Sequence, residues 1–560
     1  MRGASRLAAL LTAAAALTID VVALSNISRQ GRFLYDTSGT RFYIKGVAYQ
    51  PQGSVTTSAD NPFEEPSTFV DPLADDSGCS RDLPFLQKLG VNVVRVYSVN
   101  SSLNHDSCMS ALSGAGIYTI IDLSLPLNGS IDRDSPAWST NLQDQYIETI
   151  NTFSKYDNVL AYNVGNEVVT ASNETDAATF IKAAARDIKA YLASKNSSAL
   201  VGYAAIDGDD DFVAPLANFL SCDPSGSNSG STAIDLYGLN NYEWCGNATP
   251  SVYADKNALF SNYNVAAYFS EFGCVSSPPR LWTEVAALFS QPMTGEWSGG
   301  IAFSYFPAAS AAGQFGMVNI SSDGTTVTVS NDFNLLQAQY AQASPPNSPS
   351  ASSTANFPAC PTQNSTWLAS ASLPPTPDDA ACSCLDSTFA CKFSPPTSNT
   401  STTVGPLLDE ACGLLGQAGG NCDAISANGT TGTYGPVSFC DPSTKLSYTF
   451  NQFYLATNLQ ASSCDFAGNA TVVSGEPTNS AAASSAASSC LAAVPATFTP
   501  SAPATTAGSS SSSSTSGSSS GSSGSGNNNN GALGVFSEHA MVGAFVSALF
   551  SVLGGLLVLA

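Results

Sequence analysis

Short apolar runs rich in β-branched and aromatic residues recur along residues 25–345, with helical patterns between them. One intervening segment, Phe180–Leu192, places Phe180, Ala184, Ile188 and Leu192 on one face of a helix. The expected strands are Arg41–Gln50, Val91–Val99, Ile117–Leu123, Leu160–Asn166, Leu200–Ile206, Ile234–Tyr242, Val265–Glu271 and Ile301–Phe306. Eight strands that alternate with helices predict a (β/α)₈ barrel over 24–345.

A doubly wound open sheet is the alternative architecture for such an alternation. That fold binds nucleotides at a glycine-rich turn directly after a strand. None of the expected strands is followed by such a turn, and the barrel is therefore preferred.

The composition changes after the barrel. Residues 346–370 read as a linker, because Ala343–Ala355 is rich in Pro, Ser and Asn. Eight cysteines lie between Cys360 and Cys464, and they predict a small disulfide-stapled module over 371–475. Residues 476–531 are expected to form a stalk, since 508–526 contains only Ser, Gly and Thr.

Both ends of the chain read as targeting segments. Residues 1–23 combine Arg2 and Arg6 with an apolar run and a small-residue site, which is the pattern of a secretory signal peptide. Residues 532–560 resemble a glycosylphosphatidylinositol (GPI) attachment propeptide, with Asn530, Gly531 or Ala532 as the attachment residue. A membrane-spanning helix is the alternative, but no Lys or Arg follows the apolar tail.

Charge and histidine content narrow the chemistry. The chain has 19 basic and 43 acidic residues, for a net charge of −24, which argues against nucleic acid as a partner. With two histidines, His105 and His539, a multi-histidine metal site cannot form. We expect no metal and no organic cofactor, and acid/base or nucleophilic chemistry by Asp and Glu.

Cysteines and glycosylation sequons indicate an oxidised, extracellular protein. The chain has 14 cysteines and no paired zinc-ribbon spacing, so disulfides are the expected use. The sequons include Asn26, Asn128, Asn173, Asn247, Asn319, Asn364, Asn428 and Asn469.

One expected strand ends in Glu271, and Glu167 directly follows another. In a (β/α)₈ barrel the active site lies at the C-terminal strand ends, where Glu167 and Glu271 would stand with Gln50, Tyr97, Asp122, Tyr242 and Tyr305. A retaining glycosidase needs two carboxyl groups about 5–5.5 Å apart, one protonated and one ionised. Asn166, next to Glu167, is expected to donate to a sugar hydroxyl. The plainer interpretations are solvated strand ends for the glutamates, a turn residue for Asn166 and packing for the tyrosines.

Five segments together resemble the fungal GPI-anchored β-1,3-glucanosyltransferases, glycoside hydrolase family 72. They are Gly46–Pro51, Arg95–Val99, Gly165–Val168, Asn241–Cys245 and Ser270–Cys274. The following module is similar to the cysteine-rich carbohydrate-binding module (family 43) of the same enzymes. Its markers are Cys382-Ser383-Cys384, Ser426–Gly435 and Cys464-Asp465-Phe466.

The resemblance implies a role for each site residue. Glu167 matches the general acid/base and Glu271 the nucleophile. The positions that match the glucan-donor subsite are Gln50, Tyr97, Asp122, Asn166, Tyr242 and Tyr305. The implied disulfides are Cys79–Cys108, Cys222–Cys360 and Cys245–Cys274.

The sequence departs from the family at two positions and leaves the pairing of one cysteine and the role of the module aromatics undecided. Ala48 and Phe272 depart from the Asp and Tyr that are usual in the family. The module has seven cysteines between Cys382 and Cys464, so either Cys490 completes the set or one thiol is free. The module aromatics Tyr434, Tyr448, Phe450, Phe453 and Tyr454 suit either stacking on glucan or a small core.

The resulting hypothesis is a retaining β-1,3-glucanosyltransferase of the cell surface that elongates cell-wall glucan. Its expected partners are β-1,3-glucan as donor and acceptor, and the plasma membrane through a GPI anchor. We expect a monomer. The alternatives are a secreted endo-β-1,3-glucanase on the same scaffold and a non-catalytic glucan-binding wall protein.

Overall fold

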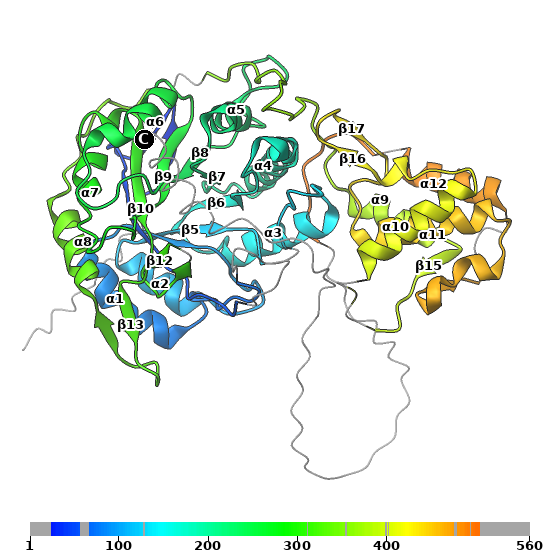
Figure 1. The fold of residues 1–560 in the computed structure, drawn as a ribbon, viewed down its shortest axis with the longest axis horizontal. Helices are drawn as coiled ribbons and strands as arrows, with labels where there is room; N and C mark the ends of the chain where they lie inside the picture. The colour runs from blue at the N-terminus through cyan, green and yellow to red at the C-terminus, as the bar shows by residue number, and fades with distance from the viewer. Residues whose placement is uncertain are drawn as a thin grey trace, which may run out of the picture.

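The computed structural model describes residues 24–55, 66–126, 129–310, 312–352, 356–397, 400, 403–474, 479–492 and 494–503. Most of these residues form a barrel domain, and a smaller helical module lies beside it on the flank of α3 and α4 (Figure 1). The predicted signal peptide, the Ser/Gly-rich run 508–526 and the predicted GPI propeptide lie outside the described residues.

Eight parallel strands close into a barrel in the order β10-β3-β4-β5-β6-β7-β8-β9. Their bounds are β3 Ile44–Ala48, β4 Val93–Val96, β5 Tyr118–Asp122, β6 Val159–Asn166, β7 Leu200–Ile206, β8 Leu236–Asn240, β9 Ala266–Phe272 and β10 Trp297–Ala302. Nearly all of their residues are buried, because the barrel interior covers one face and the surrounding helices cover the other. The predicted barrel is confirmed.

The last barrel strand begins earlier in the sequence than the apolar pattern predicts. The apolar run Ile301–Phe306 predicts a strand there, whereas β10 begins at Trp297 and includes Gly299 and Gly300. A pair of glycines normally signals a turn. Here the backbones approach so closely that a Cβ on Gly299, whose φ is 92°, would lie 2.1 Å from the carbonyl oxygen of Ile44.

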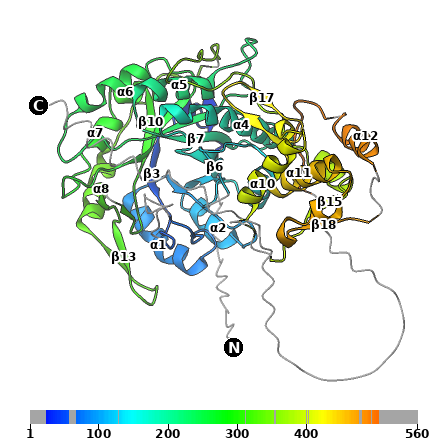
Figure 2. The same ribbon diagram turned by 45° about the vertical axis from the view of Figure 1, so that its right-hand side comes forward.

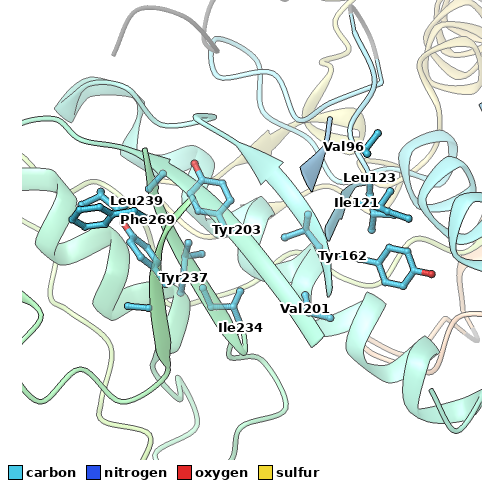
Figure 3. Close-up of a cluster of buried hydrophobic side chains, with 14 of the residues drawn as sticks. Val96, Ile121, Leu123, Tyr162, Val201, Tyr203, Ile234, Tyr237, Leu239 and Phe269 are labelled. Atoms are coloured by element: carbon cyan, nitrogen blue, oxygen red, sulfur yellow. The ribbon is translucent and has the colours of Figure 1, made fainter. Parts of the chain in front are cut away.

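A helix follows each barrel strand and packs on the outside of the sheet (Figure 1). The helices are α1 Asp76–Leu89, α2 Asp106–Gly114, α3 Thr140–Phe153, α4 Ala178–Ser194, α5 Asp210–Ser221, α6 Ala254–Leu259, α7 Glu284–Leu288 and α8 Asn331–Gln342. Figure 3 shows part of the packed interior, where Tyr162, Val201 and Tyr237 from three strands lie among the buried side chains.

Three short hairpins decorate the barrel. β1 (Ser28–Gln30) pairs with β2 (Phe33–Tyr35), β11 (Ala309–Ser310) with β12 (Gly313–Gln314), and β13 (Val318–Ile320) with β14 (Val327–Val329).

Residues 346–370 are not a free linker. The Tyr43 hydroxyl donates to the carbonyl of Pro346 (3.0 Å), and the Tyr35 hydroxyl donates to that of Pro349 (3.0 Å). Trp367 is fully buried, with its ring 5.4 Å from that of Phe219. The Pro/Ser-rich composition predicts a linker, and buried aromatic residues such as Trp367 hold this linker against the barrel.

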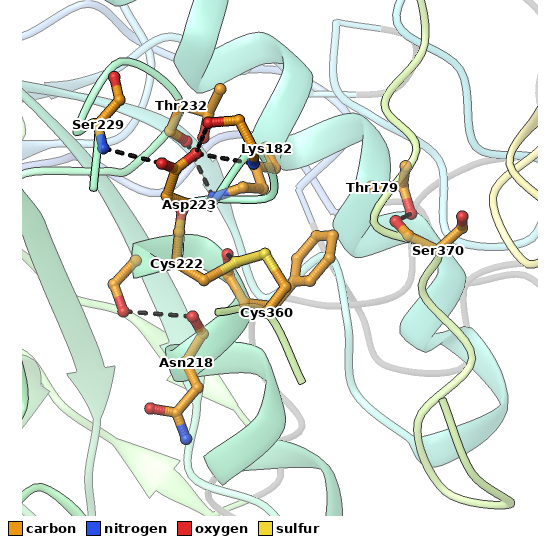
Figure 4. Close-up of a disulfide and its surroundings, with 12 residues drawn as sticks. Thr179, Lys182, Asn218, Cys222, Asp223, Ser229, Thr232, Cys360 and Ser370 are labelled. Atoms are coloured by element: carbon orange, nitrogen blue, oxygen red, sulfur yellow. Dashed lines mark hydrogen bonds between the residues drawn. A yellow bond between two sulfur atoms is a disulfide. The ribbon is translucent and has the colours of Figure 1, made fainter. Parts of the chain in front are cut away.

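A disulfide fixes this segment to helix α5. Cys222 pairs with Cys360 across 138 residues, and the Lys182 ammonium donates to the Cys222 carbonyl at 2.8 Å (Figure 4). Burial lowers the pKa of Lys182 to about 7. The other two disulfides that the family resemblance implied, Cys79–Cys108 and Cys245–Cys274, are also formed.

The module contains four helices and small strand pairs. Its elements are α9 Asp379–Ser387, α10 Val404–Gln417, α11 Pro442–Ala456, α12 Ser480–Leu491, β15 Cys391–Phe393 with β18 Ala470–Val472, and β16 Ala427–Asn428 with β17 Thr433–Tyr434. Four disulfides staple it: Cys382–Cys440, Cys384–Cys490, Cys391–Cys464 and Cys412–Cys422. All fourteen cysteines are therefore paired, and Cys490 completes the set.

Contacts of the module extend beyond residue 475, where the sequence predicts its end. Helix α12 lies within the expected stalk, but its Cys490 is bonded to α9, and the Thr376 amide donates to the carbonyl of Ala496 (3.1 Å). The Ala/Ser-rich sequence of α12 has too little apolar periodicity to predict a packed helix, and a disulfide holds it in place instead.

The module aromatics serve packing. Phe450 and Tyr454 are buried in the module core, and the Phe450 ring stacks on Phe466 with centroids 3.8 Å apart. The Tyr434 ring contacts Phe180 of α4 edge-on at 6.0 Å, and thereby joins the module to the barrel. This double cover explains why α4 is buried on nearly every face.

Polar contacts also join the two units. Arg186 of α4 donates to the Pro374 carbonyl (2.8 Å) and to the Thr376 hydroxyl (3.1 Å). The Thr140 amide of α3 donates to the Phe439 carbonyl at 2.9 Å. In Figure 2, turned by 45°, β17 lies next to α4 where the module meets the barrel.

Among the described residues, no helix is long and apolar enough to cross a bilayer.

Candidate active site

Glu271 lies near the C-terminal end of β9, almost fully buried. The Tyr97 hydroxyl donates to its Oε1 (2.9 Å), and the Tyr242 hydroxyl donates to its Oε2 (2.7 Å). A guanidinium nitrogen of Arg95 lies 3.3 Å from Oε1. Both carboxyl oxygens therefore accept from fixed donors, an arrangement that suits the ionised form.

Burial raises the pKa of Glu271 above its ordinary value. The positive charge of Arg95 and the hydroxyls of Tyr242 and Tyr97 act in the opposite direction. The net effect is a carboxylate that is more basic than an exposed glutamate, which favours nucleophilic attack when the group is ionised.

Arg95 connects the strand ends to one another. It is fully buried on β4 and donates to Asp122 Oδ2 (2.7 Å) and Asn166 Oδ1 (2.8 Å), besides its contact with Glu271. A buried guanidinium is stable only with such partners. One side chain thus ties together β4, β5, β6 and β9.

Glu167 follows β6 and is fully buried. The Asn240 amide at the end of β8 donates to its Oε1 at 2.7 Å. Oδ1 of Asn240 in turn accepts from the hydroxyl of Ser270 (2.7 Å), the residue next to Glu271. Asn240 therefore links the surroundings of the two glutamates, which lie on strands three apart in the barrel order.

Asn166 and Asp122 belong to the same network. Oδ1 of Asn166 accepts from Arg95 and from Asn240, which orients the amide group of Asn166. Asp122 accepts from Arg95 and from Asn163 (2.6 Å) and is almost completely buried. Asp122 is therefore a partner of Arg95 beneath the site.

Gln50 and Tyr305, also predicted to line the site, form their hydrogen bonds with groups other than the two glutamates. Oε1 of Gln50 accepts from the backbone amides of Tyr97 and Ser98, each at 3.1 Å, so that Gln50 supports the strand end that carries Tyr97. The Tyr305 hydroxyl donates to Asp82 (3.1 Å), and its ring is fully buried against Tyr49.

Arg95, Asn240 and Phe303 are site residues that the sequence reasoning missed. The Phe303 ring contacts Tyr97 edge-on, with centroids 6.2 Å apart. A signal for Arg95 was present, because an arginine within Val93-Val94-Arg95-Val96 requires buried acidic partners. The apolar run to Phe306 predicts Tyr305 near the rim, whereas β10 ends at Ala302 and Phe303 follows it directly.

The two departures from the family pattern are both buried. Ala48 ends β3 and its carbonyl accepts from the Tyr305 amide (2.9 Å), while the Phe272 ring contacts Trp282 at 5.8 Å. Neither bonds to a glutamate of the site. The described residues contain no cluster of His, Cys, Asp and Glu that could hold a metal ion.

Two buried carboxyl groups at the C-terminal strand ends of a (β/α)₈ barrel are typical of enzymes that act on glycosidic bonds. Here Glu271 is held by two phenols and a guanidinium, and Glu167 by an amide. The family model described as glucanosyltransferase, glycoside hydrolase family 72, matches residues 14–344, and the X8 domain model matches residues 389–471. The chain belongs to this glucanosyltransferase family.

Relatives of known name align with most of the chain. It is 39% identical to the 1,3-beta-glucanosyltransferase gas1 of Schizosaccharomyces pombe, over 82% of this chain and 81% of that protein. It is also 39% identical to a 1,3-beta-glucanosyltransferase of Arthroderma benhamiae, over 80% and 81%.

Solved structures of Saccharomyces cerevisiae Gas2p share the fold. A variant in complex with laminaritetraose and laminaripentaose superimposes with a TM-score of 0.71 at 34% identity, over 83% of this chain and 98% of that one. A complex with laminaritriose and laminaritetraose gives a TM-score of 0.69 at 35% identity, over 80% and 97%.

Proposed function

We propose that this protein is a retaining β-1,3-glucanosyltransferase that cleaves a β-1,3-glucan internally and transfers the fragment to the non-reducing end of a second glucan. The observation that carries the proposal is the pair of glutamates with different surroundings. Glu271 accepts hydrogen bonds from two phenols and faces a guanidinium, whereas Glu167 accepts from the neutral amide of Asn240. Such a difference supports opposite roles for two carboxyl groups.

In the first step, Glu271 attacks the anomeric carbon of a glucose unit within the donor glucan. Glu167 gives its proton to the glycosidic oxygen, the carbon–oxygen bond breaks, and the reducing-end fragment leaves. Tyr97 and Tyr242 orient the carboxylate of Glu271 for this attack, since each holds one of its oxygens.

In the second step, Glu167 takes the proton from the 3-hydroxyl of the acceptor glucan. That oxygen attacks the anomeric carbon, the bond to Glu271 breaks, and a new β-1,3 linkage forms with retained configuration. The Asn166 amide group, oriented by Arg95 and Asn240, is the candidate to donate to a sugar hydroxyl.

Transfer must outcompete hydrolysis by water at about 55 M, so the acceptor needs a large effective molarity at the site. Aromatic side chains suit this task. The candidates are Tyr242, whose hydroxyl bonds to Glu271, and Phe303, whose ring contacts Tyr97, and both rings lie near Phe315.

The test is to size the products formed from a reduced linear β-1,3-gluco-oligosaccharide by the purified protein. We expect products both shorter and longer than the donor, and loss of both in Glu167→Gln and Glu271→Gln. A Glu243→Gln variant, which alters a nearby acidic residue outside the hydrogen bonds to either glutamate, is the matched control and should keep transfer.

Other product patterns would decide for the alternatives. Shorter products alone would make the protein an endo-β-1,3-glucanase on the same scaffold. An unchanged oligosaccharide together with binding to insoluble glucan would make it a non-catalytic wall protein.

The cell-surface location is part of the proposal. An apolar C-terminal segment preceded by the small residues Asn530, Gly531 and Ala532 supports a GPI anchor. Phosphatidylinositol-specific phospholipase C should release the protein from intact cells, and its retention on treated cells would contradict the anchor.

A further inference from the structure

The backbone of Glu167 has an unusual conformation. Its φ is 46°, in the left-handed region that a residue with a side chain adopts only when its surroundings hold it there. The preceding strand β6 ends at Asn166, so this conformation turns the chain sharply at the point where the carboxyl group enters the site.

Two neighbouring residues of β7 hold this turn. The Glu167 amide donates to the Ala204 carbonyl at 2.8 Å. The Tyr203 hydroxyl accepts from the Val168 amide (3.0 Å) and lies 3.4 Å from the amide nitrogen of Val169. Because Val168 and Val169 are buried, Tyr203 supplies an acceptor where water does not reach.

The loop that follows β5 holds the other side of the turn. A guanidinium nitrogen of Arg133 donates to the Glu167 carbonyl at 2.8 Å. Arg133 is only half-buried and forms no ion pair with a described residue. Its directed interaction is therefore with the backbone of Glu167.

Gly165 leaves room for the ring of Tyr203. A Cβ on Gly165 would lie 3.2 Å from the Tyr203 ring and 3.1 Å from Val168, closer than most side-chain contacts. Tyr203 is fully buried, and Figure 3 shows it on the sheet beside Tyr237 of the next strand. The glycine thus lets the ring lie against β6 with its hydroxyl under the turn.

We infer that Tyr203 and Arg133 are positioning residues for the carboxyl group of Glu167. They act through the backbone: Tyr203 fixes the amides after Glu167, and Arg133 fixes its carbonyl. The inference rests on the proposed role of Glu167 as general acid/base. Neither residue exchanges a proton with the glucan, because the proton passes only between Glu167 and the sugar oxygens.

Loss of the Tyr203 hydroxyl should slow only the steps that need proton transfer by Glu167. A general acid misplaced by about 1 Å loses roughly 10²-fold in rate. A glucan leaving group must be protonated as it departs, whereas a dinitrophenolate leaves without help from an acid. Tyr203→Phe should therefore lower kcat for a β-1,3-gluco-oligosaccharide by about 10- to 100-fold. Release of dinitrophenol from a 2,4-dinitrophenyl β-1,3-gluco-oligosaccharide in the first turnover should change by less than about threefold, as proton transfer does not limit it.

Tyr237→Phe is the matched control. Tyr237 is equally buried on the neighbouring strand β8, and its hydroxyl has no hydrogen-bond partner in the part of the chain that the structure describes. Removal of the Tyr237 hydroxyl should leave the rates with both substrates unchanged.

Arg133→Gln repeats the test at a less buried position, in case Tyr203→Phe does not fold. Arg133→Gln should also lower kcat for the oligosaccharide and leave the release of dinitrophenol nearly unchanged. Arg133→Lys should restore part of kcat for the oligosaccharide. Equal losses on both substrates in Tyr203→Phe and Arg133→Gln, or no loss on either, would overturn the inference.

Glu167→Gln, measured in parallel, separates this inference from the proposed function. If Glu167→Gln keeps full activity on the oligosaccharide, the proposed acid/base role fails, whatever Tyr203→Phe does. If Glu167→Gln selectively loses the oligosaccharide while Tyr203→Phe slows both substrates equally, only the positioning role fails.

Discussion

Arg95 and Asp122 form a two-point ion pair under the candidate nucleophile: Nη2 lies 2.7 Å from Oδ2, and Nε lies 3.3 Å from Oδ1. The same guanidinium reaches Glu271 only at 3.3 Å. Most of the positive charge is thus neutralised by Asp122, which leaves Glu271 more basic than it would be beside an unshared arginine.

Asp122→Asn should release Arg95 toward Glu271. The charge of Asp122 contributes to the raised pKa of Glu271, so its removal lowers that pKa and weakens the nucleophile. We expect kcat to fall about 10- to 100-fold for such a change in charge at the site. The acidic limb of the kcat/KM profile should move to lower pH. A limb that stays in place would show that Asp122 does not influence Glu271.

Tyr242→Phe should move the acidic limb of the kcat/KM profile to higher pH. The Tyr242 hydroxyl holds Oε2 at 2.7 Å and lowers the pKa of Glu271, so its loss raises that pKa. A hydrogen bond to a charged group contributes about 1.5–3 kcal/mol, which corresponds to roughly 10- to 100-fold in kcat/KM. The pH–rate profile of Tyr253→Phe, a buried tyrosine outside this network, serves as the comparison.

The interface between barrel and module should weaken as the pH rises. Asp144 of α3 and Asp379 of α9 hydrogen-bond through their side chains, which requires that they share a proton. Burial and the charges of Asp379, Glu148 and Asp441 raise the pKa of Asp144 to about 7. An unfolded aspartate titrates near pH 3.9, so this stabilisation is complete below about pH 4 and is lost as the pH rises through about 7.

Thermal unfolding between pH 4 and pH 8 tests whether stability falls as the pH rises. Asp144→Asn should flatten the decline in melting temperature and raise the value at pH 8, since it removes one of two facing charges. The exposed Asp255→Asn on α6 should follow the native curve. A native melting temperature that rises from pH 4 to pH 8 would contradict the shared proton.

Loss of the Cys222–Cys360 disulfide should destabilise the protein more than loss of Cys412–Cys422. The first closes a loop of 138 residues and the second a loop of 10. Chain entropy alone gives about 5 against about 3 kcal/mol for loops of these lengths. Paired Cys→Ser variants compared by denaturant unfolding test this order. Equal losses would show that the segment 346–370 is held by its buried aromatic residues rather than by the disulfide.

The sequence was sufficient to predict the barrel, because β-branched runs and helical patterns alternate clearly, and Glu271 ends one of the runs while Glu167 directly follows another. It was insufficient where tertiary contacts override local composition. Gly299 and Gly300 read as a turn but lie in a strand, since the adjacent backbone leaves no room for side chains. The composition predicts a linker over 346–370 and a stalk where helix α12 lies, but Trp367 and the Cys384–Cys490 disulfide pack these segments against the folded units.

The residues of the candidate site could likewise be predicted only in part. Motif residues such as Tyr97 and Tyr242 stand out because they follow apolar strands. Asn240 and Arg95 lie within strands, and their importance depends on which strands become neighbours when the barrel closes. Tyr203 acts through a backbone amide, an interaction that leaves no pattern in a single sequence.

Covalent trapping of the intermediate tests the central claim most directly. The protein is incubated with a 2-deoxy-2-fluoro β-1,3-gluco-oligosaccharyl fluoride, which forms a glycosyl-enzyme readily and releases it slowly, and the adduct is located by peptide mass spectrometry. We expect one adduct, on the peptide that contains Glu271, and none in Glu271→Gln. An adduct on Glu167 or on another carboxylate, or turnover of the reagent without any adduct, would contradict Glu271 as the nucleophile of a retaining transferase.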